Sequence, residues 1–509
     1  MPTTRPRTVA DFVAHRARTA PDRLALAVGA DGRALTNGDV GSRVVAWTAA
    51  LRGGDAVWER RVGLAVDDPL EFAAAYLSLL AAGVAVVPLN PAAAAAERWR
   101  QADLLDVDLL VSDLPDMAPG GDRPLWRLQD GVPAASAFAA RPRSRPAAPA
   151  VLLASSGTTG TPKIVPLAER QLLSVAGRIA RHHRLGPDER GYSPLPLFHV
   201  NAQVVGLLAA LVSGAGLVID RRFHRTDFWA LLDDWRVTWL NAVPAVLAIL
   251  AEAPAPDETT ATRLRFARSA SAPLPPAVQV RFQERSGVSV LETYGMTEAA
   301  SQIAANPLDE MGRQPGSAGL PVGVELRVVD GDGRPCRPGE DGAVEIRGPD
   351  VVRHYLRPDG QPRPARSADG WLVTGDVGHL DERGFVFLTG RADDVINCGG
   401  EKIYPREIED VLRTHPAVTQ AVVVGRRDDV LGECPVAYVT TRDGTVAGAL
   451  AVALMQRCEA HLGRSRRPRR LVVVDRVPTG PTGKVSRRLL QRDTAGLRDL
   501  AAVEQTRAS

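Results

Sequence analysis

Residues 151–163 read VLLASSGTTGTPK, an apolar run that passes directly into serine, threonine and glycine residues and ends on Lys163. The segment 150–154 is typical of a buried strand. A strand that leads into a loop of backbone N–H groups, hydroxyls and an ammonium offers good partners for phosphate oxygens. The loop is not a Walker A motif, because Gly-Lys-Ser/Thr is missing and a proline precedes the lysine. The alternative is a flexible surface loop, which the buried strand before it disfavours.

Lysine usage indicates the same chemistry. The chain contains 62 lysines and arginines, and only three of them are lysines: Lys163, Lys402 and Lys484. Arginine therefore provides nearly every generic positive charge, and lysine should persist where a compact ammonium is required. All three lie in the glycine-rich segments GTTGTPK, CGGEKIYP and PTGPTGK. This placement favours phosphate or carboxylate chemistry over chance.

Composition excludes several classes of protein. The chain has 509 residues, 45% hydrophobic and 24% charged, with a formal net charge of +3. These values are ordinary for a globular protein of about three structural units, and they give no indication of nucleic-acid binding. The four scattered cysteines show no CxxC spacing, and residues 1–12 lack the apolar core of a secretory signal. We therefore expect a reduced, cytoplasmic protein without a zinc site or a disulfide scaffold.

One apolar stretch, Phe72–Leu89, is nearly long enough to cross a bilayer. Gly83 and Pro88 interrupt it, and the valine-rich run 84–87 follows the glycine. The pattern predicts a buried helix, a glycine stop and a buried strand rather than a membrane span.

The pattern of the chain changes twice. Up to about residue 320, helix-like and strand-like segments alternate, which predicts layered α/β sheets. From about Val324, short strands are separated by turn signals such as Asp330–Gly333 and Asp381–Gly384, which predict hairpins. After Arg391 the pattern is α+β. We expect strands at 61–66, 237–243, 420–424 and 471–474 and helices at 70–82, 227–235, 405–414 and 446–462, with a loop at 133–149.

Six motifs follow one another along the chain. After ASSGTTGTPK at 154–163 come PLPLFH at 194–199, ETYGMTE at 292–298, TGD at 374–376, GRAD at 390–393 with GGEKI at 399–403, and PTGK at 481–484. This set resembles the acyl-adenylate-forming superfamily, which includes acyl- and aryl-CoA synthetases, non-ribosomal peptide adenylation domains and beetle luciferases. The matches extend over about residues 60–490, and six motifs in order are far more specific than one.

The resemblance implies an α/β fold in two domains. Residues 1–392 would form a large multi-sheet AMP-binding domain with layered α/β sheets and a small β-barrel. Residues 393–509 would form a smaller, mobile α+β lid that carries the catalytic lysine. Asp393 matches the family hinge, which needs only a few element-terminal residues that absorb backbone change. Taken alone, Asp393 would be a solvated turn residue.

In this family a carboxylate attacks the α-phosphorus of ATP, and catalysis is mostly positioning and charge neutralisation. By resemblance, Tyr294 stacks on adenine, and Asp376 accepts hydrogen bonds from both ribose hydroxyls. Taken alone, Tyr294 would be a core residue and Asp376 a turn residue. Glu298 would hold Mg²⁺. The implied catalytic residues are Lys484, Thr297, Glu298 and His199. The implied ATP-binding residues are Ser155, Ser156, Gly157, Thr158, Thr159, Gly160, Lys163, Ser271, Ala272, Glu292, Thr293, Tyr294, Gly295, Met296, Asp376 and Arg391.

The segment CGGEKI resembles the version of the motif found in CoA-forming relatives, where two glycines let pantetheine pass close to the backbone. Arg466 lies in a basic run at 464–470, where many relatives place a basic residue near a CoA phosphate. A solvated charge run is the alternative. The implied CoA-binding residues are Gly399, Gly400, Glu401, Lys402 and Arg466.

The acid is less well defined by the sequence. LFHV at 197–200 replaces the Phe-Asp pattern of amino-acid adenylation domains, and segments 228–244, 266–276 and 294–323 look most like the oxalate–CoA ligase branch. Ser301 departs from that branch, which usually has histidine there, and a neutral hydroxyl is a weak partner for a second carboxylate. Arg268, Ser269 and Ser271 either bind a polar acid or form a turn before the adenine loop. The implied acyl-pocket residues are His199, Val200, Asn201, Ser269, Gly295 and Ser301.

We therefore expect an ATP- and Mg²⁺-dependent ligase that joins a small carboxylic acid to CoA through an acyl-adenylate. Oxalate is left open as the acid but is not favoured. The nearest alternative passes the activated group to an amine or a carrier protein. A luciferase-like oxygenase and a nucleotide-binding regulator without catalysis are further alternatives, and Lys484, Asp376 and Glu298 argue against the regulator. The sequence does not decide between a monomer and a homodimer.

Overall fold

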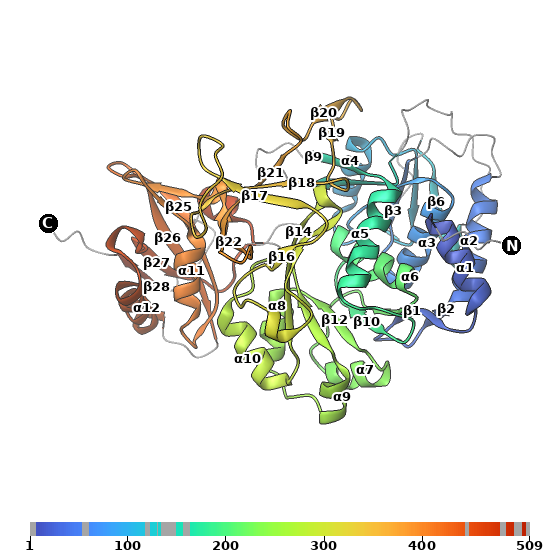
Figure 1. Cartoon of the computed structure of the whole chain (residues 1–509), viewed down its shortest axis with the longest axis horizontal. Helices are drawn as coiled ribbons and strands as arrows, with labels where there is room; N and C mark the ends of the chain where they lie inside the picture. Colours follow the sequence, from blue (N-terminus) through green and yellow to red (C-terminus); the bar gives the residue numbers. More distant parts are fainter. Residues whose placement is uncertain are drawn as a thin grey trace. The chain divides into compact units, whose positions relative to one another are not determined.

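A computed structural model describes residues 7–52, 61–117, 123–129, 131–133, 149–155, 163–442, 447–478, 485–492 and 501–504 (Figure 1). The chain divides into two compact units. The first unit comprises Met1–Leu326 and Ile346–Leu372, and the second comprises Arg327–Glu345 and Val373–Ser509. Among the described residues, no helix has both the length and the apolar character needed to cross a bilayer.

Within its described residues, the first unit contains two nine-stranded sheets. One sheet has the order β16 (Leu320–Pro321), β15 (Ser301–Ala305), β14 (Val290–Met296), β13 (Phe266–Ser269), β12 (Trp239–Ala242), β10 (Arg190–Ser193), β11 (Gly216–Ile219), β1 (Leu24–Val28), β2 (Ala34–Thr36). The other has the order β20 (Pro362–Pro364), β19 (His354–Leu356), β9 (Lys163–Leu167), β8 (Val151–Ser155), β4 (Ala85–Pro88), β3 (Arg61–Ala65), β5 (Leu109–Ser112), β6 (Leu125–Gln129), β7 (Val132–Pro133). The strands from β14 to β1 pair in parallel, as the alternating sequence pattern predicts.

Helix α3 (Pro69–Ala81) lies between the two sheets. It contacts β1 of one sheet and β3 and β4 of the other, and nearly all of its residues are buried. Proline at its first position and the side chain of Asp68, which accepts hydrogen bonds from two N–H groups of the first turn, define its start. Gly83, at φ +74°, follows its end and leads into β4. The apolar stretch 72–89 is therefore a buried helix followed by a buried strand, as predicted.

Further helices cover the outer faces of these sheets. Helices α7 (Phe228–Asp234), α8 (Pro244–Ala251), α9 (Glu258–Arg263) and α10 (Pro276–Ser286) gather on one side of β10 and β12 (Figure 1). Phe228, Leu247 and Phe282 pack there against Tyr192 and Leu240 in one apolar cluster. Helix α4 (Ala95–Leu104) covers the other sheet through Ala102, which packs on Leu110.

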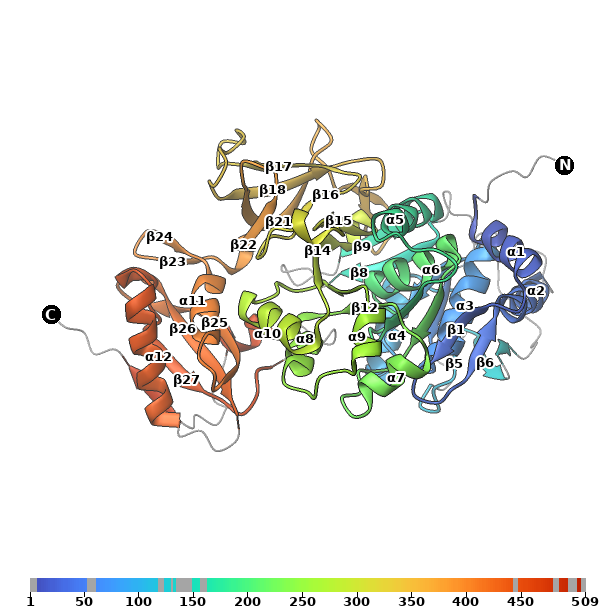
Figure 2. The same ribbon diagram turned by 60° about the horizontal axis from the view of Figure 1, so that its bottom comes forward.

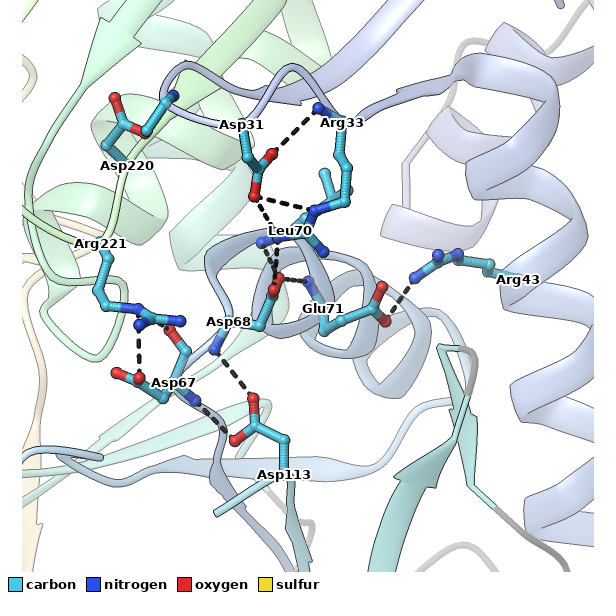
Figure 3. A network of polar contacts seen from close by, with 11 residues as sticks. Asp31, Arg33, Arg43, Asp67, Asp68, Leu70, Glu71, Asp113, Asp220 and Arg221 are labelled. Carbon is cyan, nitrogen blue, oxygen red and sulfur yellow. Dashed lines mark hydrogen bonds and ion pairs between the residues drawn. The ribbon is translucent and has the colours of Figure 1, made fainter. Parts of the chain in front are cut away.

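A polar network fixes the loop that joins β3 to α3 (Figure 3). Asp113 follows β5 and accepts hydrogen bonds from the N–H groups of Asp67 and Asp68, at 2.9 and 3.0 Å. Arg33, between β1 and β2, pairs with Asp68 at 2.6 Å, and Arg221, after β11, pairs with Asp67 at 3.2 Å. Because these arginines come from one sheet and the aspartates from loops of the other, the network ties the two sheets together.

In the second unit, short strands form a four-stranded sheet of the order β17 (Glu325–Val329), β18 (Gly342–Arg347), β21 (Leu372–Leu380), β22 (Val386–Arg391). The expected hairpin over Asp381–Gly384 joins β21 to β22. The outer strands β17 and β22 do not pair with each other among the described residues.

The C-terminal part of the second unit is a six-stranded sheet built on β25 (Val418–Asp428), β26 (Gly432–Thr441) and β27 (Arg470–Val473). Helices α11 (Pro405–Arg413) and α12 (Ala447–His461) pack on one face of it through Ile408 and Leu454 (Figure 2). Helix α13 (Arg487–Arg492) packs on the other face through Leu490. The helices and strands expected after Arg391 are thus present, within a few residues of their predicted ends.

Candidate active site

Polar side chains gather where parallel strands of the first unit end. Ser193, Asn241 and Ser269 lie at or next to the carboxyl ends of β10, β12 and β13, and all three are buried. The amide of Asn241 donates to Ser193 Oγ at 3.3 Å and to Asn201 Oδ1 at 3.2 Å. Ligands of open α/β sheets bind outside the carboxyl ends of the strands, so this edge is a candidate site.

Two predicted segments meet at the same edge. Thr293 Oγ1 donates to the carbonyl oxygen of Ser269 at 3.1 Å, which joins the ETYGMTE segment to β13. The amide of Asn201 donates to Ser271 Oγ at 3.1 Å, which joins the predicted acyl-pocket segment to the predicted adenine loop. Tyr294, on β14, is buried. The structure therefore brings together predicted site residues from three separate segments, namely Asn201, Ser269, Ser271 and Thr293.

His199 lies just before an uncommon backbone segment. Its N–H donates to the carbonyl oxygen of Pro196 at 3.1 Å, and its ring contacts Phe198 at 4.2 Å between centroids. The next element, η1 (Ala202–Leu208), is a π-helix. Such segments are rare and are frequent at functional sites. Asn201, at the start of η1, is buried, and Val200 is half-buried.

Strained backbone conformations also occur at this place, as they do at four other non-glycine residues of the described chain. Three non-glycine residues there have positive φ: Ser271 at 72°, Ala300 at 52° and Ser301 at 106°. These conformations cost free energy and persist where the surroundings enforce them, often at active sites. The strained residues lie in the two segments predicted to contact adenine and the acid.

Gly295 is required by close backbone packing between β14 and β15. A Cβ at this position would lie 1.9 Å from the carbonyl oxygen of Ser301. We predict that Gly295→Ala destabilises the protein by about 3 kcal/mol or more, because neither backbone can move without breaking the strand pair. Urea unfolding measures the loss. Gly186→Ala, where nothing lies within 4 Å, is the control. Equal midpoints for the two variants would contradict the assignment.

Glu298 has a partner that was not predicted from the sequence. Tyr355 Oη donates to Glu298 Oε1 at 3.1 Å, and the N–H of Val352 donates to the carbonyl oxygen of Glu298 at 2.8 Å. Burial and the adjacent carboxylate raise the pKa of Tyr355, so its hydroxyl stays protonated. Lys163 Nζ lies 5.3 Å from the centre of the same ring. Tyr355 therefore joins the end of the phosphate-loop motif to the predicted magnesium ligand.

A single carboxylate at Glu298 fits Mg²⁺ better than a metal that is held by protein ligands alone. Among the described residues, no group of three or more His, Cys, Asp or Glu side chains could hold a metal. Mg²⁺ is commonly bound by one or two carboxylates together with substrate phosphates and water. Glu298 provides one such carboxylate, and it shares the neighbour Tyr355 with Lys163, a cation suited to phosphate. Of the phosphate loop itself, Ser155 ends β8 and pairs with Lys163, whereas Ser156–Gly160 lie outside the described residues.

In the second unit, the predicted ribose ligand is held by an ion pair. Asp376 and Arg391 are register partners on β21 and β22, and Arg391 Nη1 lies 2.8 Å from Asp376 Oδ1. The N–H of Asp376 donates to Thr374 Oγ1 at 3.0 Å. Asp393 lies in the short 3-10 turn η4 (Ala392–Asp394) that follows Arg391.

The predicted CoA residues form a hairpin. Gly399 and Gly400, with φ of 61° and 89°, turn the chain between β23 (Ile396–Cys398) and β24 (Glu401–Ile403). Lys402 is exposed on β24. Arg466 pairs with Glu401 at 3.4 Å and with Glu407 at 3.1 Å, so it contacts the hairpin directly. Lys484 lies outside the described residues.

Sequence reasoning missed three site residues. Asn241 and Gln302 stand inside apolar strand segments, WLNA and SQIAA, where a single polar residue among hydrophobic ones was the only signal. Tyr355 comes from a strand that the sequence pattern did not single out. Each contacts a predicted residue only because the fold brings distant segments together.

Comparison with known proteins identifies the family. The family model described as AMP-binding enzyme matches residues 13–356, and the model of the AMP-binding enzyme C-terminal domain matches residues 407–484. The chain belongs to the AMP-binding enzyme family. The resemblance inferred from the six motifs is thereby confirmed.

Relatives of known function and structure extend over nearly the whole chain. The sulfoacetate–CoA ligase of Cupriavidus necator is 37% identical and aligns with 94% of this chain and 96% of its own. The oxalate–CoA ligase of Arabidopsis thaliana is 33% identical, with 95% and 98% covered. The O-succinylbenzoate CoA synthetase of Bacillus subtilis, solved with ATP and magnesium, has a TM-score of 0.80 at 28% identity, with 94% and 98% covered.

These relatives confirm four predictions. The α/β fold with a large multi-sheet N-terminal part and a smaller C-terminal part is confirmed by the solved structure. The expected kind of enzyme, an AMP-forming acid–CoA ligase, and its cofactors ATP, Mg²⁺ and CoA are confirmed for the family. The likeness to the oxalate–CoA ligase branch is confirmed as well. The domain boundary at 392/393 and the individual site residues stay predictions.

Proposed function

We propose that this protein converts a small carboxylic acid, ATP and CoA into an acyl-CoA, AMP and pyrophosphate in two half-reactions. A carboxylate oxygen attacks the α-phosphorus and pyrophosphate leaves; the CoA sulfur then attacks the acyl carbon and AMP leaves. The observation that carries the proposal is the polar cluster at the ends of β10, β12 and β13, which contacts both the adenine-loop and ETYGMTE segments. Ligands of open α/β sheets bind at the ends of the strands, which is where this cluster lies.

In the first unit, Tyr294 and the loop at Ser271–Ala272 bind adenine in this proposal. Thr297 contacts the α-phosphate and Glu298 holds Mg²⁺. Held by Glu298, Mg²⁺ would supply positive charge that offsets the charge developing on the phosphates during the transfer. The hydrogen bond from Tyr355 to Glu298 keeps that carboxylate oriented. The remaining ATP contacts come from Ser155–Gly160, Lys163 and Glu292–Met296.

In the second unit, Asp376 binds the ribose, with Arg391 holding its carboxylate in place. Residues 393–509 act as the lid and Asp393 as its hinge. Gly399, Gly400, Glu401, Lys402 and Arg466 receive CoA, supported by the contact between Arg466 and the hairpin. Lys484 neutralises charge as the pentavalent state develops.

The acid is small in this proposal, and its pocket is formed by His199, Val200, Asn201, Ser269, Gly295 and Ser301. The sulfoacetate and oxalate named for the two relatives are both short acids. A cytoplasmic location is part of the proposal, since all four cysteines are free thiols and three of them are buried.

Identification of the product tests the proposal. The protein is incubated with ATP, Mg²⁺ and a panel of short carboxylic acids, with and without CoA, and the products are identified by mass spectrometry. We expect pyrophosphate, AMP and one acyl-CoA thioester, with strong stimulation by CoA. Pyrophosphate release without a thioester under every condition would show that the acceptor is a molecule other than CoA. Absence of acid-dependent pyrophosphate release would refute the ligase.

A further inference from the structure

Arg268, on β13, is a buried cation without an acidic partner among the described residues. It is 1% exposed. The other arginine buried to this extent, Arg98, pairs with Asp116. Burial lowers the pKa of Arg268 to about 9, and its guanidinium therefore remains charged at neutral pH. Burial of an unpaired charge is costly, so a group that balances this charge is expected nearby.

The neighbours of Arg268 satisfy it only weakly. Its Nη1 donates to Asn201 Oδ1 at 3.3 Å and to Asn241 Oδ1 at 3.1 Å, and its Nη2 donates to Gln302 Oε1 at 3.5 Å. All three acceptors are neutral amide oxygens, and two of the distances exceed the usual range for N–H···O bonds. The Nε atom has no partner in the described part of the chain.

A further donor beside Arg268 lacks a partner in the same part of the structure. Gln302 Nε2, whose own Oε1 accepts from Arg268, is buried and makes no hydrogen bond to described residues. Buried polar atoms are nearly always hydrogen-bonded, so two orphaned atoms at one cation, Arg268 Nε and Gln302 Nε2, indicate a missing ligand. Guanidinium and amide N–H groups are donors only, which selects an anion.

Arg16 shows what a purely structural buried arginine looks like in this fold. It is 8% exposed, and its two terminal nitrogens donate to the carbonyl oxygens of Ala210, Leu211, Gly214 and Ala215, at 3.0 to 3.4 Å. These carbonyls lie at the end of α6 (Ala209–Ser213), where the helix dipole favours a cation. Arg268 has no comparable set of acceptors among the described residues.

Arg268 also lies beside the proposed acid pocket. Asn201, which accepts from it, is two residues after His199, and Ser269 is the next residue of β13. Gln302 is the register partner of Gly295 and follows Ser301. The guanidinium therefore contacts Asn201 of that pocket and Gln302 next to it. Arg268 also precedes the pocket residue Ser269 in sequence.

We propose that Arg268, with Gln302, binds the second anionic group of a short acid whose first carboxylate is adenylated. This inference rests on the proposed ligase function. A second negative charge close to the reacting carboxylate would be repelled by the ATP phosphates, and the guanidinium offsets that repulsion. Arg268 thus supplies the cationic partner that Ser301, a neutral hydroxyl, does not.

The test compares short dianionic acids with monoanionic isosteres of the same shape, in which the second group is neutral. The three pairs are oxalate and oxamate, malonate and malonamate, and sulfoacetate and sulfamoylacetate. Each probe keeps the carboxylate that reacts and differs only in the charge of the second group. We measure acid-dependent pyrophosphate release as kcat/KM for both members of each pair. The wild-type protein should prefer at least one dianion over its isostere by about 10-fold or more, the range expected for a charge-assisted hydrogen bond.

Variants of Arg268 assign that preference to the side chain. In Arg268→Met the ratio of kcat/KM for the dianion to kcat/KM for its isostere should fall by about 10- to 100-fold. Only the kcat/KM for the dianion should decrease. Arg268→Lys keeps the charge without the forked geometry and should retain part of the preference. Arg16→Met is the matched control, because it removes a buried arginine of the same unit away from the pocket and should leave the ratio unchanged.

The outcomes separate this inference from the proposed function. A dianion preference that is lost in Arg268→Met and partly kept in Arg268→Lys supports it. Turnover of acids without a dianion preference in the wild-type protein would overturn the inference and leave the ligase intact. A preference that persists in the Arg268 variants would overturn it as well. If both variants fail to fold, Gln302→Met, which removes the orphaned amide donor beside Arg268, should lower the ratio instead, and an unchanged ratio would overturn the inference. If no acid of the panel, dianionic or monoanionic, leads to pyrophosphate release, the ligase function itself is refuted.

Discussion

Replacement of Lys484 by alanine is expected to reduce acyl-adenylate formation by about 100- to 1000-fold, the range seen when a group that stabilises transition-state charge is removed. The reaction of preformed acyl-adenylate with CoA should be largely retained. The reason is that Lys484 acts on the carboxylate and the α-phosphate while charge develops there. Once the adenylate exists, that charge has been dispersed. The two half-reactions are measured separately, with ATP and acid for the first and with synthetic adenylate and CoA for the second.

Lys402→Ala is the reciprocal control for Lys484→Ala. Both are among the three lysines of a chain that otherwise uses arginine, and Lys402 is exposed beside the glycine turn proposed to receive CoA. We expect Lys402→Ala to impair thioester formation and to spare adenylation. Equal loss of both half-reactions in Lys484→Ala, or adenylation at the wild-type rate, would remove Lys484 from the catalytic role.

Glu298→Gln should reduce adenylation by about 100-fold or more at low Mg²⁺, because the variant loses the carboxylate proposed to hold the metal. Glutamine keeps the shape of the side chain and can still accept the hydrogen bond that Tyr355 donates at 3.1 Å. Folding should therefore change little. The half-reaction from preformed adenylate, in which no pyrophosphate is released, should be nearly unaffected.

A magnesium titration distinguishes this variant from Lys484→Ala. Higher Mg²⁺ should partly restore Glu298→Gln, since the defect is weaker metal binding, and should not restore Lys484→Ala. Tyr355→Phe is the matched control, because it removes only the hydroxyl that donates to Glu298 and should shift the Mg²⁺ dependence by a few-fold. An unchanged Mg²⁺ dependence in Glu298→Gln would exclude Glu298 as the metal ligand.

Much of the fold could be predicted from local sequence signals. Helix α3 was predicted from an apolar run and from Gly83 after its end, and both signals act within the segment itself. The C-terminal elements followed from similar patterns, and α11 begins at the predicted Pro405. The six motifs defined the family because their residues are close together in sequence.

The group of polar side chains around Arg268 could not be predicted in the same way. Its members come from three strands and from the segment before η1, and only parallel pairing of β12 with β13 brings Asn241 opposite Arg268. The sequence left Arg268 between an acid-binding role and a turn. The structure shows it inside β13 and buried, so its charge must be balanced in three dimensions rather than by water. The partner of Glu298 was missed for a similar reason, because Tyr355 is 57 residues away in sequence.

The central claim is that the chain forms an acyl-adenylate before CoA takes part. Acid-dependent exchange of labelled pyrophosphate into ATP, measured without CoA, tests this most directly. Reversible adenylation predicts rapid exchange that requires the acid and Mg²⁺ and is lost in Lys484→Ala. Exchange that requires CoA, or release of orthophosphate and ADP in place of pyrophosphate and AMP, would contradict the account.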